Sequence, residues 1–593
     1  MIQRSIRTAI VLALVVVVFS LVMPTAAQVA PGDGLAAIES RVAELENHLH
    51  KARAIRDIKR LQYSYAHYAE LGLWSDLGDL FATDGVAHYA QGDFRGPESL
   101  RKFYLQELGR GQLGLAEGRI YPHIMIQPVV TIAPDGKTAR GRWHVIAMLG
   151  SFGGTSASWA GVVYENRYVS EDGVWKISEL SYSSQYSGRY SPPGLTLSKW
   201  DLPYHFTPQS AGNPVTNSGS SLPAKGPATL EGLQQRWVEL ARGAEQLRNE
   251  TDVLNLQHNY GYYSDQKMWG AVANLFASDG TLESGLRGVY VGREKIRRAL
   301  TRFGGEGLNI AEVNDHLQLA TVVHVEPDGK TAKARGVELS VSGVKGRGAQ
   351  WEEGIFENAY VKQNGVWKIQ SVHYYPRVIT DYEVGWAKSA KPAAGPDAEF
   401  PPDRPSTETY ETYPKMHYPQ FHYVNPVTRE PVQYPAGIAN ARSGAVTLLG
   451  SVPQASPPKN EKEFTNRLNE LEVQIHSSIV YDAAENLINA YGYYLDDSRD
   501  SLQELFNAPY RPSVSDAVAV HQTVQPVINL AGDRRSATIR ARLLKVEAGK
   551  VSGGTYEARA TNRGGAWKLQ SLSLKETWSS PFNQWTPTVE QQR

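Results

Sequence analysis

The sequence contains no cysteine among its 593 residues. This absence excludes disulfide bonds, thiolate nucleophiles, cysteine-ligated zinc and iron–sulfur clusters. A net charge of one sign is also missing, because 61 Lys and Arg residues balance 61 Asp and Glu residues. A balanced chain has no bulk charge with which to hold nucleic acid or an anionic membrane. Any chemistry must therefore come from His, carboxylate, Tyr and amide side chains.

The longest apolar run lies at the amino terminus. Arg4 and Arg7 precede uncharged residues 9–23, and small residues follow at 24–27. The run is about 15 residues long, short of the ~20 that a spanning helix needs. We therefore expect a cleaved secretory signal over residues 1–27, with an uncleaved anchor as the alternative. Secretion without cysteine favours a bacterial periplasmic or secreted protein.

Two long blocks of the sequence repeat in the same order. The block from Leu61 to Gly85 recurs from Leu256 to Gly280, at an offset of 195 residues. A third copy is weaker and shorter. Such collinear copies indicate tandem structural repeats. Further matched segments are Pro134–Ala139 with Pro327–Ala332, Gly173–Ile177 with Gly365–Ile369 and Gly565–Leu569, and Tyr260–Tyr263 with Tyr491–Tyr494.

Each repeat begins with helices and continues with long strands. In the first repeat we predict strands over 124–133, 137–149, 159–169 and 174–186. Helices followed by a strand meander predict an α+β domain, with helices on one face of an antiparallel sheet. The first helices carry apolar residues at spacings of three and four, as a heptad seam does. Because each run is shorter than the ~3–4 heptads of a typical coiled coil, we favour a helix that packs on its own domain.

Pro-, Ser- and Gly-rich stretches separate the repeats, and both contain an aromatic–proline string, at 202–206 and 418–423. Because aromatic side chains gain by burial, we expect extended tails packed over domain surfaces. The predicted division is a signal (1–27), domain 1 (35–190), a linker (191–227), domain 2 (228–380), a Pro-rich linker or tail (381–460), a degenerate domain 3 (461–580) and a C-terminal tail (581–593).

The motifs of the first two repeats resemble a known family. A helix with Tyr-x-x-x-x-(Asp/Glu) is followed by Trp, by Leu-Phe-x-x-Asp-Gly, by a His that opens a strand, by an Asp-Gly turn and by a Trp-Lys strand. This order resembles the SnoaL-like domain of the nuclear transport factor 2-like superfamily. The resemblance implies three tandem cone-shaped domains, each with helices on a curved antiparallel sheet of four or more strands. The superfamily includes dehydratases, isomerases, cyclases and non-catalytic binders, so fold alone does not set the activity.

Three histidines, His123, His316 and His521, align across the repeats. A histidine at the start of a strand beside a cavity can act as a general acid or base near neutral pH. The resemblance places this position in the pocket of many family members. The alternative is a structural histidine bonded to a backbone carbonyl, which its persistence in the shortened third repeat favours.

Two tyrosines precede carboxylates by five residues, Tyr65 before Glu70 and Tyr260 before Asp265. A buried hydroxyl can orient a substrate carbonyl, and a nearby carboxylate can hold the histidine or accept a proton. We therefore count all four among the candidate catalytic residues, with His123 and His316. The alternative is a core tyrosine and a carboxylate that caps the helix.

Two asparagines are predicted to contact substrate. Asn166 and Asn358 lie between aromatic residues on one strand face, where a buried amide needs a partner. The third repeat has Ala558 instead, which predicts two complete pockets and a vestigial third. Trp74 and Trp269, from the shared motif, and His144 are further predicted substrate contacts.

His144 occurs in the first repeat alone and shares a strand face with Arg142. The resemblance to dehydratases suggests a second pocket histidine near this strand. A cross-strand pair between Arg142 and Glu165 would instead place His144 on the outer face, away from Asn166. The face on which it lies decides its role.

Two functions remain open. One is a cofactor-free dehydratase or isomerase that transfers protons on a small apolar or aromatic molecule; the other is a non-catalytic periplasmic ligand-binding or scaffold protein. We predict no cofactor, since the sequence has no metal-ligand spacing and no strand before its Gly-rich match. We predict neither a nucleic-acid partner nor stable membrane insertion after cleavage, and self-association, if it occurs, through sheet faces or the N-terminal helices.

Overall fold

A computed structural model describes residues 34–155, 157–199, 201–215, 229–438, 456–510, 518–532 and 534–590. The predicted signal over residues 1–27 lies outside these ranges. No helix within them is long and apolar enough to cross a membrane.

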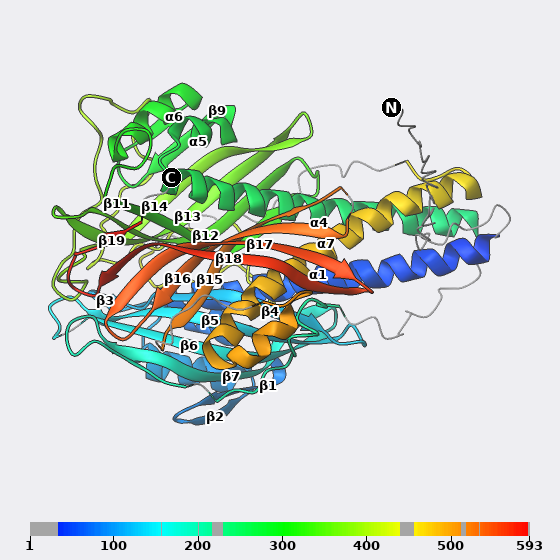
Figure 1. The fold of residues 1–593 in the computed structure, drawn as a ribbon, viewed down its shortest axis with the longest axis horizontal. Coiled ribbons are helices and arrows are strands. Elements are labelled where there is room, and N and C mark those ends of the chain that lie inside the picture. Colours follow the sequence, from blue (N-terminus) through cyan, green and yellow to red (C-terminus); the bar gives the residue numbers. More distant parts are fainter. Residues whose placement is uncertain are drawn as a thin grey trace, which may run out of the picture.

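The three repeats each pair one long helix with one sheet (Figure 1). The first contains α1 (Leu35–Leu71), α2 (Trp74–Gly78), β1 (Phe81–Tyr89), β2 (Gly92–Arg95), α3 (Pro97–Phe103), a π-helical turn (Tyr104–Leu108), β3 (Arg119–Ile120), β4 (His123–Ile132), β5 (Thr138–Ser151), β6 (Ser158–Glu171), β7 (Val174–Arg189) and β8 (Leu195–Leu197). The second contains α4 (Leu230–Asp265), α5 (Trp269–Leu275), β9 (Phe276–Ser284), β10 (Val289–Val291), α6 (Arg293–Leu300), a 3-10 turn (Thr301–Phe303), β11 (Glu312–Val325), β12 (Thr331–Val344), β13 (Gly348–Gln363) and β14 (Val366–Asp381). The third contains α7 (Glu461–Asp497), a 3-10 helix (Arg499–Leu505), β15 (Val520–Leu530), β16 (Ser536–Val546), β17 (Lys550–Arg563), β18 (Ala566–Pro581) and β19 (Thr588–Val589).

The four long strands of each repeat form the antiparallel meander that the sequence predicts. A further strand was not predicted. The Leu-Phe-x-x-Asp-Gly motif forms β1 and β9, which pair in parallel with β7 and β14, so these two sheets are mixed. The Asp-Gly pair in the motif is typical of a turn, and it lies at a register shift within the strand pairing.

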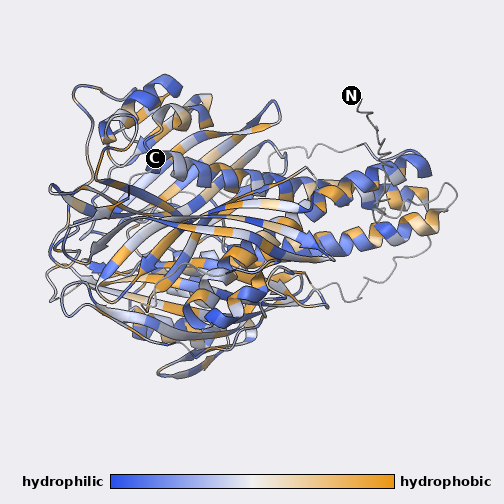
Figure 2. Cartoon of the chain, in the orientation of Figure 1, coloured by the Kyte–Doolittle hydropathy of each residue, from blue (hydrophilic) through white to orange (hydrophobic). Residues whose placement is uncertain are grey.

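The amino-terminal halves of α1, α4 and α7 pack together as a three-helix bundle that projects from the sheets (Figure 1). Figure 2 shows hydrophobic and hydrophilic residues alternating along these helices. The preference for helices that pack on their own domains was therefore wrong. The apolar seam of each helix is short, but the seams of the three helices pack against one another and form one buried cluster. The buried seam consists of Ile38, Val42, Leu45, Leu49, Leu233, Trp237, Leu240, Ala244, Leu247, Phe464, Leu468, Leu471 and Ile475.

The outer faces of the three sheets meet in one central core. Residues from all three repeats share a single buried cluster, which includes Ile124, Met148, Leu317, Trp351 and Trp578. Parts of the sheet faces and of the amino-terminal helices thus pack against one another within the chain, and self-association stays a prediction.

A ring of equivalent hydrogen bonds joins the repeats. In α1, His67 Nε2 donates to the carbonyl oxygen of Ala320, in β11, at 2.9 Å. In α4 and α7, the hydroxyls of Tyr262 and Tyr493 donate to the carbonyls of Gln525 and Gln127, at 3.3 and 2.9 Å. All three acceptors have positive φ, at the bulge of the first long strand. Each long helix therefore docks on the strand bulge of another repeat.

The Pro-rich segments also pack on the folded repeats. Tyr204 stacks on Tyr494 of α7, with ring centroids 4.9 Å apart. Tyr418, Phe421 and Tyr423, from the segment after β14, belong to the buried core of the first repeat.

Candidate functional site

The second repeat encloses a cavity of about 480 Å³ between the end of α4 and the inner face of its sheet. Four predicted site residues line it: Tyr260, Trp269, His316 and Asn358. Exposed Phe303 and Arg347 also line it, which places its opening near the 3-10 turn and the β12–β13 hairpin. The other lining residues include Ser264, Lys267, Leu282, Glu312, Gln318, Glu338, Ser340, Glu352, Phe356, Val372 and Tyr374.

His316 is held by a carboxylate from the end of α4. The backbone amide of His316 donates to Asp265 Oδ1 at 2.6 Å, and its Nδ1 lies 3.6 Å from the same oxygen. Asp265 Oδ2 pairs with Arg542, of the third repeat, at 3.0 Å. Both Asp265 and Arg542 are buried. The site in the second repeat is therefore completed by a cation from the third.

The electrostatics of the cavity favour a protonated His316. Burial disfavours the charged ring, but Asp265, Glu338 and Glu352 outweigh it and raise the pKa of His316 to about 9. Burial and the Glu338 carboxyl raise the pKa of Glu352 to about 7. Near neutral pH the cavity thus combines an imidazolium that can donate a proton with a carboxyl that can accept one.

The sequence analysis missed Glu338 and Glu352. The first repeat has Val145 and Ala160 at the equivalent positions, and the third has Leu543 and Ser552. Comparison of the repeats could have found them, because two carboxyls replace apolar or small residues on the inner face of one copy.

Asn358 is fixed by a chain of amides. Its Nδ2 donates to Gln257 Oε1 at 3.0 Å, and its Oδ1 accepts from the His373 backbone amide at 3.1 Å. Gln257 donates to Gln318 at 2.7 Å, and Gln318 donates to Glu338 at 2.6 Å. The partner that the buried amide of Asn358 requires is thus a protein side chain, Gln257. The same chain of hydrogen bonds orients Glu338 through Gln318.

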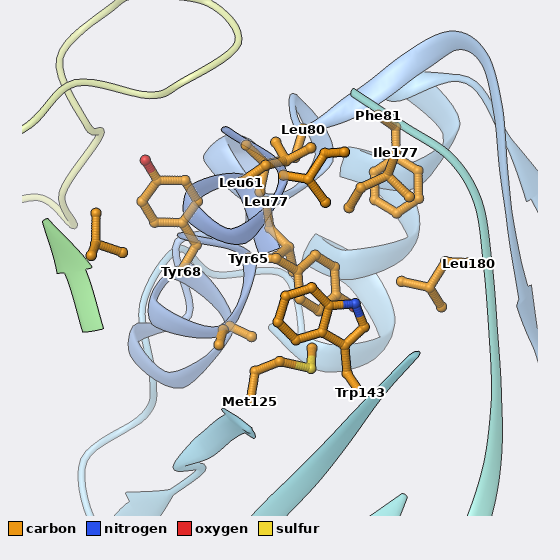
Figure 3. Packing of buried hydrophobic residues seen from close by; sticks show 14 of the residues in the cluster. Leu61, Tyr65, Tyr68, Leu77, Leu80, Phe81, Met125, Trp143, Ile177 and Leu180 are labelled. Atoms are coloured by element: carbon orange, nitrogen blue, oxygen red, sulfur yellow. The ribbon is translucent and has the colours of Figure 1, made fainter. Parts of the chain in front are cut away.

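The equivalent residues of the first repeat lie in a packed interior. Figure 3 shows Tyr65 among buried side chains that include Met125 and Trp143. The Tyr65 and Tyr89 hydroxyls are 3.2 Å apart. His123 is 6% exposed, and burial lowers its pKa to about 4.

Glu70 pairs with residues other than His123. Its Oε1 lies 3.0 Å from His67 Nδ1, and its Oε2 lies 3.7 Å from Arg377 of the second repeat. Trp74 is fully buried in the same core. The prediction of a second complete pocket does not fit this packing, because aromatic rings occupy the interior around His123.

Comparison with protein families identifies the two repeats. The sequence profile of the SnoaL-like domain matches residues 50–181 and 245–373. The chain carries two SnoaL-like domains. A search of curated proteins finds no match.

Solved structures match single domains of the chain. A protein described as a putative scytalone dehydratase from Novosphingobium aromaticivorans is 21% identical, covering 25% of this chain and 91% of its own, with a TM-score of 0.21. A type 2 hexachlorocyclohexane dehydrochlorinase is 18% identical over 27% of this chain and 99% of its own, with a TM-score of 0.21. A protein of unknown function from Mycobacterium tuberculosis is 20% identical over 24% of this chain and 78% of its own, with a TM-score of 0.19.

The substrate contact predicted for His144, in the first SnoaL-like domain, does not fit its position. Arg142 and Glu165 form the cross-strand pair at 2.9 Å, so His144 lies on the outer face of the sheet. It is fully buried, 3.0 Å from Gln185 and edge-on to Tyr493 of the third repeat. His144 is a contact between repeats.

The third repeat keeps the histidine–carboxylate pair in a closed setting. The His521 backbone amide donates to Asp496 at 2.7 Å, and the ring also bonds to this carboxylate. His521 is 3% exposed. In the described part of the chain, no cluster of His, Asp or Glu has the arrangement of a metal site. The second SnoaL-like domain is therefore the one in which the aligned histidine faces a large cavity.

Proposed function

We propose that the second SnoaL-like domain binds a small molecule and catalyses cofactor-free proton transfer on it, as a dehydratase or isomerase does. The observation that carries this proposal is His316: it is anchored by Asp265 and faces a cavity that also contains Glu352. Aromatic walls from Tyr260, Trp269 and other rings suit an apolar or aromatic substrate.

The chemistry divides between two groups. The Glu352 carboxylate removes a proton from a carbon next to a substrate carbonyl. In dehydration, the His316 imidazolium donates its proton to the hydroxyl at the next carbon; the C–O bond breaks, water leaves and a C=C bond forms. In isomerisation, it protonates the carbonyl oxygen instead. The second step returns that proton to His316 and the Glu352 proton to another carbon.

The first prediction concerns proton exchange. In D2O, the protein should incorporate deuterium next to the carbonyl of those aromatic ketones in a test panel that it binds, as measured by NMR. His316→Gln and Glu352→Gln should each slow incorporation about 100-fold or more, the usual contribution of a general acid or base. The rate should rise as Glu352 loses its proton near pH 7 and fall as His316 loses its proton near pH 9.

The other repeats provide matched controls. His123→Gln and His521→Gln alter the equivalent histidines, and both should leave the exchange rate unchanged. Equal losses in all three histidine variants would sink the assignment to the second domain. The proposal would also fail if the wild-type protein binds ketones but neither incorporates deuterium into them nor dehydrates them. The cavity would then be a binding site only.

We further propose that the other two repeats act as a scaffold. Two observations support this role: the interior around His123 is packed, and Arg542 of the third repeat forms an ion pair with Asp265 of the second. We also propose that the protein is exported to the periplasm or beyond, on the strength of residues 1–27.

A further inference from the structure

The tail after the first domain docks on a cross-strand ion pair. The ring of Tyr204 lies over the Arg142 guanidinium, 3.9 Å from centroid to Cζ, and Arg142 donates to the Leu202 carbonyl at 3.3 Å. His205 bonds to Glu165, which also accepts from Arg142. The Arg142 side chain is 0% exposed and that of Glu165 is 14% exposed. Two successive tail residues, Tyr204 and His205, therefore cover this charged pair.

The tail after the second domain repeats this geometry. The ring of Phe421 lies 3.7 Å from the Arg335 guanidinium, and Arg335 donates to the Pro419 carbonyl at 3.2 Å. His422 and Glu357 are bonded at 2.7 Å. The Arg335 and Glu357 side chains are 0% and 13% exposed.

The third copy of this site is open. Arg540 and Glu557 pair in the same strand register, but 3.8 Å apart, and their side chains are 54% and 65% exposed. Arg540 lies over Tyr262 of α4 at 5.3 Å, as Arg142 lies over Tyr493 of α7 at 5.2 Å. The inner half of the site is thus built as in the first repeat, while within the described ranges no second ring covers the guanidinium.

The printed sequence contains no further segment of the docking type. Both docked segments place an aromatic residue, a histidine and a second aromatic residue in succession, at 204–206 and 421–423. No other histidine of the chain has aromatic residues on both sides, and the segments outside the described ranges contain no histidine.

We propose that Arg540 and Glu557 form a docking site for an extended segment of a partner protein that carries the aromatic–His–aromatic sequence. Its first ring would cover the guanidinium through a cation–π contact, a preceding carbonyl would accept from Arg540, and its histidine would bond to Glu557. The site lies on the outer face of the third sheet, so it does not depend on the proposed chemistry.

A peptide taken from this chain tests the proposal. A labelled peptide of residues 201–207, blocked at both ends, is titrated with the full-length protein and followed by fluorescence polarisation. Saturable binding is expected. It should weaken at least tenfold with Arg540→Ala, and equally with peptides in which alanine replaces the residue at position 204 or 205. Arg559→Ala removes another exposed arginine of the same sheet and should leave the affinity unchanged.

Three results would overturn the proposal. The first is the absence of saturable binding by the wild-type protein. The second is binding that survives Arg540→Ala, or that Arg559→Ala weakens to the same extent, since either indicates non-specific attraction. The third is a photo-crosslink from the peptide to the Arg142 or Arg335 site, which would mean that the peptide displaces a built-in tail.

Discussion

His123 and His316 align in the sequence, but the pKa of His123 is lowered and the pKa of His316 is raised. Both rings lose solvation by burial. Around His316, three carboxyls more than compensate for this loss. Around His123 the neighbours are aromatic, and Glu70 is turned toward His67. The aligned position could be predicted from the sequence, whereas its ionisation could not, because Glu338, Glu352 and Arg542 come from other strands or another repeat.

The second prediction is that NMR titration places the pKa of His316 near 9 and that of His123 near 4. For His316, the folded-state pKa exceeds the unfolded value of about 6.5, so its stabilisation is full below pH 6.5 and is lost through pH 9. For His123, the unfolded chain binds the proton more tightly, so stability falls as the pH drops from 6.5 to 4. Each effect reaches about 3 kcal/mol, at ~1.4 kcal/mol per pKa unit.

The control for this prediction is denaturant unfolding of His123→Gln. This variant should lose less stability than the wild type between pH 7 and pH 4.5. If both proteins lose the same free energy of unfolding, then His123 does not set the acid sensitivity.

The long helices are joined by layers that contain one residue from each repeat. Arg56 donates to Thr251 at 3.2 Å and pairs with Asp482 at 3.0 Å. One turn later, Lys59 pairs with Asp482 and Glu485. The heptad spacing could be read from the sequence, but not the partners of each helix, since short seams look alike. In these two layers, the first repeat supplies the cations and the third supplies the anions.

The third prediction tests the pair of Lys59 and Glu485, beside which Leu254, the aligned residue of the second repeat, lines the same small cavity. Lys59→Leu alone should lower the free energy of unfolding by about 3–5 kcal/mol, because it leaves buried carboxylates short of a cation. The double variant Lys59→Leu/Glu485→Leu creates a layer of three leucines and should recover most of this loss, as replacement of a buried pair by apolar residues often does. Urea unfolding measures both. A double variant with a lower free energy of unfolding than the single variant would show that the ion pair itself stabilises the bundle.

At the scale of the molecule, the three repeats form a closed ring rather than beads on a string. Each long helix bonds to a strand bulge of another repeat, and the sheets share one core. Repeat number and strand order could be predicted from sequence motifs. The ring could not, because its bonds end on backbone carbonyls such as that of Ala320, which carry no side-chain signature. The ring also explains why Arg542 serves a site in the second domain.

The fourth prediction tests the ion pair between Arg542 of the third repeat and Asp265 of the second. Arg542→Met leaves Asp265 and Asp315 buried without their shared cation, which should cost about 3–5 kcal/mol of unfolding free energy. Arg540→Met, two residues earlier on β16, removes an exposed arginine and should change stability by less than about 0.5 kcal/mol. If the fold survives Arg542→Met, the NMR signals of His316 should shift while those of His123 stay fixed. Unchanged His316 signals would show that Asp265 holds the ring without help from the third repeat, which would then contribute packing alone.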